Sequence, residues 1–329
     1  MLIIRRPRVG VLLYLWVIKM KLFFGNMTCV LALTTSSLAL AATQSTFKLN
    51  GEVGGGMIFN SALSVDELDE VSSQSDNGYE FNAAVKGKWQ LTDKATLSSS
   101  YAYNQKTYTE YSQFDLALHQ LNIDGSYKFN SSEIGVRVDG ASASLAGNTF
   151  LNYQQVSLYL GHFVQPETYL RSSVKTKNKS FAELSDRDAS GLGASIDVFH
   201  FMDGSNTMLM LGLSAEKEDG QDSQFDYLGL GIHTKITHKF SLFGLDSKVG
   251  FGLRFQNKDY QSVEVETLPK SGDMSERDEN RQVIEANWDL RLLNNLSVRT
   301  ELQHGDFKSQ LESQTYQQTI ASVGLKYSF

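Results

Sequence analysis

The amino-acid sequence predicts an all-β fold, namely a transmembrane antiparallel up-and-down β-barrel of about fourteen strands. Apolar residues recur at every second position along almost all of the chain after residue 46, whereas apolar spacing of helical type is nearly absent. The connections between the expected strands alternate between short and long, as in membrane barrels with short periplasmic turns and longer outer loops. The chain also opens with a segment of export type. These observations together predict an exported barrel.

The first 41 residues differ in composition from the rest of the chain. They hold five basic residues and no acidic one, and from Met20 they run MKLFFGNMTCVLALTTSSLALA, in which an apolar stretch leads to Ala39-Leu40-Ala41. This order is typical of a signal peptide with its cleavage site. We expect residues 1–41 to be a signal peptide, with Met20 favoured as the translation start, and residues 42–329 to form a single transmembrane barrel domain.

The charge, cysteine count and apolar content of the chain disfavour several classes of partner and fold. The formal net charge is -7, and residues 42–329 keep 25 basic against 37 acidic residues. A surface with this balance disfavours nucleic acid as a partner. Cys29 is the single cysteine, which excludes an internal disulfide and a cysteine-bound zinc. A polytopic helical membrane protein is excluded too, because apolar runs of about 20 residues are missing after the N-terminal segment.

Alternating segments follow one another to the end of the chain. We expect strands at residues 46–60, 78–91, 95–109, 116–130, 133–146, 149–164, 168–183, 189–202, 207–218, 225–240, 247–260, 279–293, 296–309 and 314–329. Each is long enough for the 9 to 11 tilted residues that a bilayer requires, whereas about 5 to 6 suffice in a soluble β-sandwich. A soluble sandwich or lipocalin-like barrel is the alternative fold. The longest connections, 61–77 and 261–278, lie at the end away from both termini, which places the termini at the periplasm.

Charged residues of both signs share the polar face of the strands, and we expect that face to line the lumen. The candidate lumen-lining residues are Lys86, Lys88, Asp124, Arg137, Asp139, Arg171, Lys175, Asp197, Arg254, Glu285, Asp289, Arg299 and Glu301. A barrel of this size leaves a lumen roughly 10 Å wide after side chains. Opposed charges there would orient polar solutes in an open pore. Alternatively, they pair across strands and brace a closed lumen. Most strand glycines fall on the same inward face, where they leave room or permit curvature.

Two further clusters carry weaker signals. The first long loop holds Asp66, Glu67, Asp69, Glu70 and Asp76, which either bind divalent cations that bridge lipopolysaccharide phosphates or stay solvated. The run His304-Gly305-Asp306 is the nearest approach to a catalytic cluster, but its place near a hairpin end favours a solvated loop. We therefore expect no enzyme activity, no cofactor and no metal site.

The C-terminal segment SVGLKYSF carries a family resemblance. Its outward residues are Ala321, Val323, Leu325, Tyr327 and Phe329, and the ending resembles the C-terminal assembly signal of Gram-negative outer-membrane barrel proteins. That resemblance implies an outer-membrane location. It also implies the barrel assembly machinery as a partner during biogenesis and outer-membrane lipids and lipopolysaccharide as the surroundings.

A narrower resemblance concerns the last strands. Arg277-Asp278, Leu290-Arg291-Leu292, Ser309, Tyr316, Val323-Gly324-Leu325 and Phe329 resemble the barrel of surface lipoprotein assembly modifiers, with Gln310 where that pattern prefers Asn. Those proteins carry an N-terminal helical repeat domain, for which residues 42–46 leave no room. The barrel-only length also resembles monomeric fourteen-stranded porins. The resemblance to porins implies a channel for passive diffusion of small polar solutes. The alternative is a non-conducting barrel with a partner-binding, surface-assembly or lipoprotein-export role.

Overall fold

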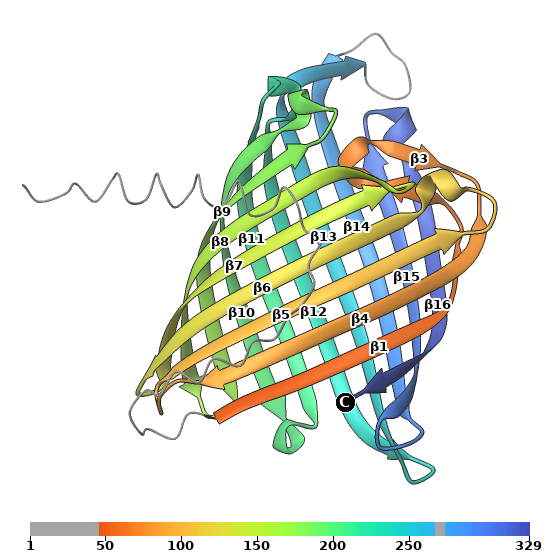
Figure 1. Ribbon diagram of the computed structural model, residues 1–329. Helices are drawn as coiled ribbons and strands as arrows, with labels where there is room; N and C mark the ends of the chain where they lie inside the picture. Colours follow the sequence, from red (N-terminus) through yellow and green to blue (C-terminus); the bar gives the residue numbers. More distant parts are fainter. Residues whose placement is uncertain (1–45, 267–273) are drawn as a thin grey trace, which may run out of the picture. The chain divides into compact units, whose positions relative to one another are not determined.

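The computed structural model describes residues 46–266 and 274–329, and the expected signal peptide lies outside them. The barrel strands are β1 (Thr46–Asn60), β4 (Asp76–Gln90), β5 (Ala95–Tyr108), β6 (Leu116–Phe129), β7 (Ser132–Leu145), β8 (Asn148–Gln165), β9 (Thr168–Phe181), β10 (Ala189–Met202), β11 (Thr207–Gly220), β12 (Tyr227–Leu242), β13 (Leu245–Glu266), β14 (Met274–Arg291), β15 (Leu296–Ser309) and β16 (Tyr316–Ser328). Each pairs antiparallel with its neighbours, and β1 pairs with β16 to close a fourteen-stranded barrel (Figure 1). The predicted fold class is confirmed. In the described part of the chain, no helix is long and apolar enough to cross a membrane.

The outer surface of the barrel is apolar because alternate residues of each strand point away from the lumen. On β12, for example, Leu228, Leu230 and Ile232 all have exposed side chains. Closure removes sheet edges, so the backbone groups inside a bilayer are bonded to neighbouring strands. An exposed apolar surface on a closed barrel is the arrangement that a lipid environment stabilises.

The connections between strands differ in length at the two ends of the barrel. At the end that holds Thr46 and Phe329, which we call the inner end, the turns are tight, as at Phe243-Gly244, where both residues have positive φ (51° and 79°). A two-residue hairpin of this kind matches the twist of the flanking strands and favours glycine at its second position. The opposite end, the outer end, carries most of the longer connections, as the sequence predicted.

Three outer connections share one local device. Each contains a single 3-10 turn, namely η2 (Ser112–Phe114), η3 (Ser185–Arg187) and η5 (Ser223–Phe225), and each is followed by an aspartate. Asp115, Asp188 and Asp226 accept hydrogen bonds from the backbone N–H at or near the end of the preceding strand, at 2.6–2.7 Å. The carboxylate thus satisfies a donor that the ladder leaves unpaired, which ends the strand cleanly.

The last long connection is shorter than predicted. We expected a loop over 261–278, but β13 runs to Glu266 and β14 starts at Met274. The register shifts between Tyr260 and Glu264, which marks a β-bulge. A bulge inserts extra residues into one strand and lets pairing resume beyond them, so a break in alternation does not end the hairpin here.

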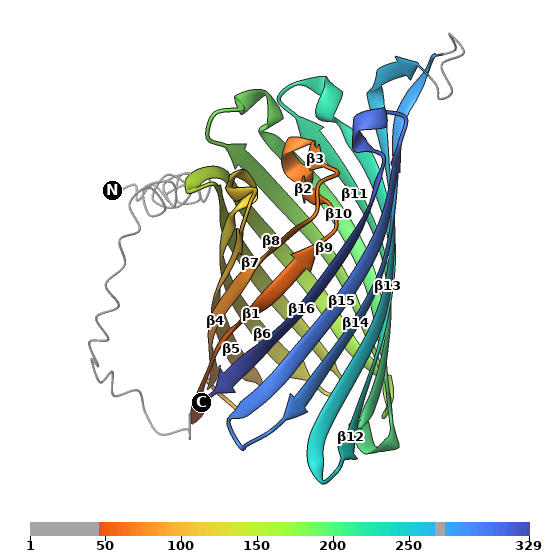
Figure 2. The same cartoon turned by 90° about the vertical axis from the view of Figure 1, so that its right-hand side faces the viewer.

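The first long connection folds back on itself and carries its own small sheet. Residues 61–75, which we call the latch, contain β2 (Leu63–Val65), the 3-10 turn η1 (Asp66–Leu68) and β3 (Glu70–Ser72), with β2 and β3 paired antiparallel. Figure 2 shows this segment between the walls of the barrel at the outer end. Leu63 is only 1% exposed, so the latch is packed inside the barrel mouth instead of projecting from it.

Candidate functional site: the lumen and its outer closure

The structure places each of the predicted lumen-lining residues on the face of its strand opposite to the exposed apolar side chains. Lys86, for example, alternates on β4 with Val85 and Gly87, which belong to the outward set. Lys86 and Lys88 are exposed near the inner end. The inward direction follows from strand parity, whereas the contacts that these side chains make required the three-dimensional arrangement.

Many of the inward charges are paired. Arg137 and Asp139 form an ion pair at 2.8 Å along β7. Asp289 accepts from Arg299 at 3.0 Å on the neighbouring strand and lies 3.4 Å from the ammonium of Lys326. Such pairs neutralise the wall locally and connect adjacent strands, in agreement with the bracing role that the sequence left open beside an open pore.

Other pairs reach across a whole strand. Lys175 and Lys177 on β9 contact Glu216 and Glu218 on β11, at 3.2 Å and 2.7 Å respectively, although β10 lies between them. Gly193 of β10 is in register with Lys175 and Glu216, and a Cβ there would lie 2.6 Å from Lys175 Cε. The missing side chain therefore makes the crossing possible.

The same device recurs around the barrel. The hydroxyl of Tyr159 on β8 donates to Asp124 on β6 at 3.0 Å, over Gly135 on β7. Lys235 on β12 meets Glu285 on β14 at 2.7 Å, over Gly252 on β13. Asp197 on β10 lies 3.3 Å from His233 on β12, over Gly212 on β11. The inward glycines therefore serve to let side chains of alternate strands bond to each other.

We predict that filling one of these crossings destabilises the barrel. Gly193→Val would push a branched side chain into Lys175, and overpacking of this kind costs about 1–3 kcal/mol. The urea midpoint of unfolding, followed by heat-modifiable migration in gels, should fall. Gly125→Val is the matched control, because a Cβ at Gly125 meets nothing within 4 Å. Equal midpoints for the two variants would contradict the crossing role.

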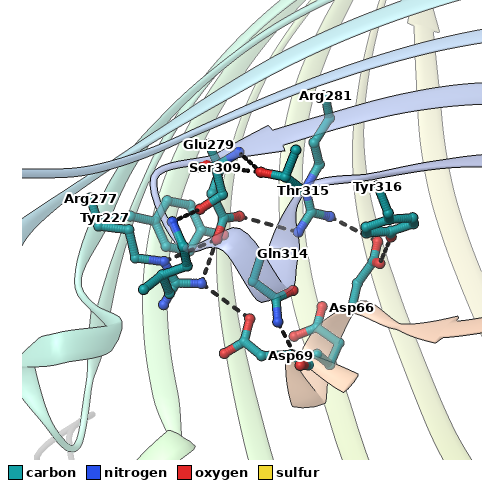
Figure 3. Close-up of polar contacts among 12 residues, drawn as sticks. Asp66, Asp69, Tyr227, Arg277, Glu279, Arg281, Ser309, Gln314, Thr315 and Tyr316 are labelled. Carbon is teal, nitrogen blue, oxygen red and sulfur yellow. Dashed lines mark hydrogen bonds and ion pairs between the residues drawn. The ribbon is translucent and has the colours of Figure 1, made fainter. Parts of the chain in front are cut away.

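Asp69 of the latch is held by two arginines from different parts of the outer end. Asp69 lies 3.0 Å from Arg187, in the connection between β9 and β10, and 3.1 Å from Arg277 on β14. Gln314 donates to the backbone oxygen of Asp69 at 2.6 Å. Figure 3 shows Asp69 beneath Arg277 and Gln314. One latch aspartate thus joins three separate outer segments.

A second aspartate of the latch faces the last strands. Asp66 lies 2.8 Å from Arg281 on β14 and accepts from the hydroxyl of Tyr316 on β16 at 3.1 Å (Figure 3). Gln318 donates to the backbone oxygen of Ala62 at 2.6 Å, which fixes the start of the latch to the same strand. The latch is therefore bonded to β14 and β16.

The opposite wall completes the arrangement. Glu67 lies 2.8 Å from the ammonium of Lys179 on β9, and Lys179 also meets Glu218 on β11 at 3.1 Å. β9 and β16 lie half a barrel apart in the strand order. Because the latch is bonded to both walls, it crosses the outer mouth of the lumen.

These contacts correct two expectations. The acidic loop was expected either to bind cations outside the barrel or to stay solvated, but Asp66, Glu67 and Asp69 point inward to basic partners. Arg277 was expected in the long connection 261–278, but it lies on β14 and, together with Arg281 of the same strand, holds the latch. The sequence did contain a signal for these contacts. The latch has acidic residues and no basic one, so basic partners for its carboxylates had to come from other segments.

The pKa of the Glu67 carboxyl, in the latch, lies below its ordinary value. Burial raises that pKa, but the ammonium groups of Lys179, Lys258 and Lys177 together lower it by more. A depressed pKa means that the ionised carboxylate stabilises the closed latch at any pH above the ordinary range near 4.3, and that this contribution is lost as pH falls through the depressed value.

We predict a corresponding pH dependence. The latch should stay closed at pH 7 and pH 5 and loosen only on further acidification, tested at pH 3, because Glu67 gains a proton only as pH falls through its depressed pKa. Single-molecule conductance in planar bilayers at the three values is the measurement. The Glu67→Gln variant should lose most of the change between pH 5 and pH 3. An opening between pH 7 and pH 5 would contradict the assignment to Glu67.

The lumen below the latch is not filled. A cavity of about 620 Å³ opens near the inner end, and its lining includes Lys239, Lys248, Arg291 and Lys326. A second, of about 520 Å³, lies along the strands next to the β1–β16 seam and holds Glu52, among others. Space inside the barrel therefore remains on the inner side of the closure.

The predicted assembly signal lies on the outward face of β16. Val323, Leu325 and Tyr327 are exposed beside β1 and β15. The backbone of Phe329 exchanges two hydrogen bonds with Gly51, at 2.8 Å and 2.9 Å, and its ring covers that glycine. The C-terminal residue is thus part of the closure between the first and last strands, and its role in assembly stays a prediction.

Comparison with known proteins places this geometry in a family. Residues 59–329 match the family model described as surface lipoprotein assembly modifier. A comparison with curated protein sequences gives no match. Among solved structures, the outer-membrane channel DcaP of Acinetobacter baumannii is 12% identical with a TM-score of 0.50, covering 87% of this chain and 97% of that chain.

Two further solved barrels resemble the chain. OmpT of Vibrio cholerae in its trimer form is 9% identical with a TM-score of 0.48, covering 87% of this chain and 99% of its own. An anion-selective porin from Comamonas acidovorans is 10% identical with a TM-score of 0.45, covering 87% and 100%. At such identities the likeness concerns the fold alone, whereas the family model spans most of the chain. The chain is an outer-membrane β-barrel of a Gram-negative bacterium and belongs to the surface lipoprotein assembly modifier family.

Proposed function

We propose that this barrel acts in the display of lipoproteins at the cell surface and that the latch closes its outer mouth at rest. The proposal rests on membership of the family and on one structural observation, namely that the latch is bonded to β9 on one wall and to β14 and β16 on the other. A bonded segment across the mouth restricts free diffusion through the barrel. A barrel that engages a protein client needs its lumen sealed between clients.

The test is a deletion of the gene in its native host. We expect one or more lipoproteins to disappear from the surface, measured by protease shaving of intact cells and mass spectrometry, while their total amount in the cell is unchanged. Complementation with the intact chain should restore them. Unaltered surface lipoproteins in the deletion strain, with the barrel present in the wild type, would overturn the proposal.

A channel for passive diffusion of small polar solutes is the second candidate. It is favoured by the cavities of about 520 and 620 Å³, which are lined by charges of both signs below the latch. Conductance of the intact protein in a planar bilayer separates the candidates. Frequent steps that scale with salt concentration would support the channel, whereas a folded but silent protein would support the closed barrel.

A further inference from the structure

A third cavity has a mixed lining in which large apolar side chains gather. It measures about 410 Å³ and lies directly beneath the latch, which contributes Leu63 and Val65 to its lining. On the walls, Leu116 and Leu118 of β6 and Ile320 of β16 occupy inward positions, and Leu151, Val283 and Phe307 line the same cavity. The charged part of the lining consists of Asp66, Glu67, Lys106, Arg254 and Arg281. Apolar surface exposed to water costs about 25 cal/mol per Å², so this patch calls for an apolar occupant.

Contact with the latch covers only part of this apolar surface. Leu68 of the latch packs against Ala143, Leu151 and Phe181 of the wall, together with Leu118. Leu116 and Ile320, however, line both this cavity and the adjoining one of about 520 Å³. The apolar surface therefore continues beyond the latch contact, down the inside of the barrel.

One cation lies at the junction of the two cavities. Lys106 of β5 lines both, and among the described residues it makes no direct hydrogen bond or ion pair, although Glu80 stands opposite it in the register. An ammonium group at the open end of an apolar pocket suits a chain molecule with an oxygen-bearing head, because the amine donates to a carboxylate or carbonyl while the tail is buried.

We infer that the cavity beneath the latch binds a fatty acyl chain. The methyl end lies under Leu63 and Val65, the chain passes between Leu118 and Ile320, and the carboxylate or carbonyl head is held by Lys106. Entry is from the inner side, since the adjoining cavity extends to Glu52 and Lys326 near the inner end. The volume lies within the range of about 300–1,000 Å³ that is usual for small-molecule pockets. That the acyl group comes from the lipid anchor of a lipoprotein rests on the proposed function.

The binding site is tested by photo-crosslinking. The whole protein, freed of lipid and held in an amphipol, is irradiated with a palmitate that carries a diazirine near its methyl end, and the labelled peptides are mapped by mass spectrometry. We expect label on β6 and on the latch. Label confined to outward residues of the barrel would overturn the site.

Substitutions in the cavity lining test the same site by a second route. Leu118→Trp should fill the pocket and reduce labelling at least tenfold, and Leu118→Gln provides a second change if the larger residue impairs folding. Ser100→Trp is the matched control, because Ser100 shares the inward face of β5 with Lys106 but is not part of either cavity lining. Heat-modifiable migration confirms that each variant is folded. Equal labelling of folded Leu118 and Ser100 variants would refute the proposal.

A Lys106 variant and competing lipids identify the source of the acyl chain. Lys106→Gln should weaken palmitate binding about tenfold, the size of one charge-assisted hydrogen bond, and leave the neutral methyl ester unaffected. A triacylated lipopeptide that displaces the probe better than phospholipid supports a lipoprotein anchor. Displacement by phospholipid alone supports the acyl site and refutes that source. If no label appears at the site while the deletion strain still loses surface lipoproteins, the acyl pocket is refuted and the proposed function stands.

Discussion

Neutralising the latch, as Asp66→Asn, Glu67→Gln and Asp69→Asn together, is expected to open the outer mouth of the barrel. The half-exposed Asp66 and Glu67 contribute about 1 kcal/mol each through their ion pairs, and Asp69, held by two arginines, about 2 kcal/mol. A total near 4 kcal/mol corresponds to a shift of several hundredfold in the closed-to-open ratio. The measurement is the open probability in planar bilayers, which should rise steeply over that of the intact protein.

The control for this experiment lies in the same segment. Glu70 is also acidic and belongs to β3, but it is exposed and forms no ion pair among the described residues, so Glu70→Gln should leave the open probability unchanged. Its substitution separates the effect of lost pairing from that of lost charge. A folded triple variant as silent as the Glu70 variant would show that the latch contacts do not control the mouth.

Loss of Phe329 is expected to reduce the amount of folded barrel in the outer membrane several-fold. Deletion removes both backbone hydrogen bonds to Gly51 and the ring that covers it, whereas Phe329→Ala removes the ring alone. Deletion should therefore have the larger effect. The readout is the heat-modifiable fraction in isolated outer membranes.

A second outward phenylalanine supplies the comparison. Phe251 on β13 is 47% exposed on the lipid side, so Phe251→Ala removes the same phenyl group from a strand away from the closure. That variant should assemble almost normally. If it loses as much folded protein as Phe329→Ala, the effect comes from lost apolar surface and not from the C-terminal position.

The strands were predictable because each one is long and half-buried in lipid. A two-residue period repeated over 13 residues, as in β16, has no helical interpretation. Strand ends agreed with the structure to within a few residues for most elements. The end of β13 was missed because a bulge interrupts alternation without ending the pairing. The face of each lumen residue followed from the same parity, since a change of one position would reverse it.

The contacts of the lumen residues were not predictable in the same way. Glu67 and Lys179 are 112 positions apart, and Asp69 and Arg277 are 208 apart. No local pattern relates such residues. They meet because the barrel closes and brings β9 and β14 to the two sides of one segment. Their charges were visible in the sequence, but the inward fold of the latch was not.

Alternation along the chain thus decided the fold, the membrane face and the inward set of charges, because side-chain direction in a strand depends only on position. Closure of the sheet decided the rest. It placed side chains of alternate strands close enough to bond over an inward glycine, as Lys175 does with Glu216 across β10. It also set the latch across the mouth and left the apolar cavity beneath it. Contacts through the lumen join residues far apart in the chain, and only the three-dimensional arrangement brings them together.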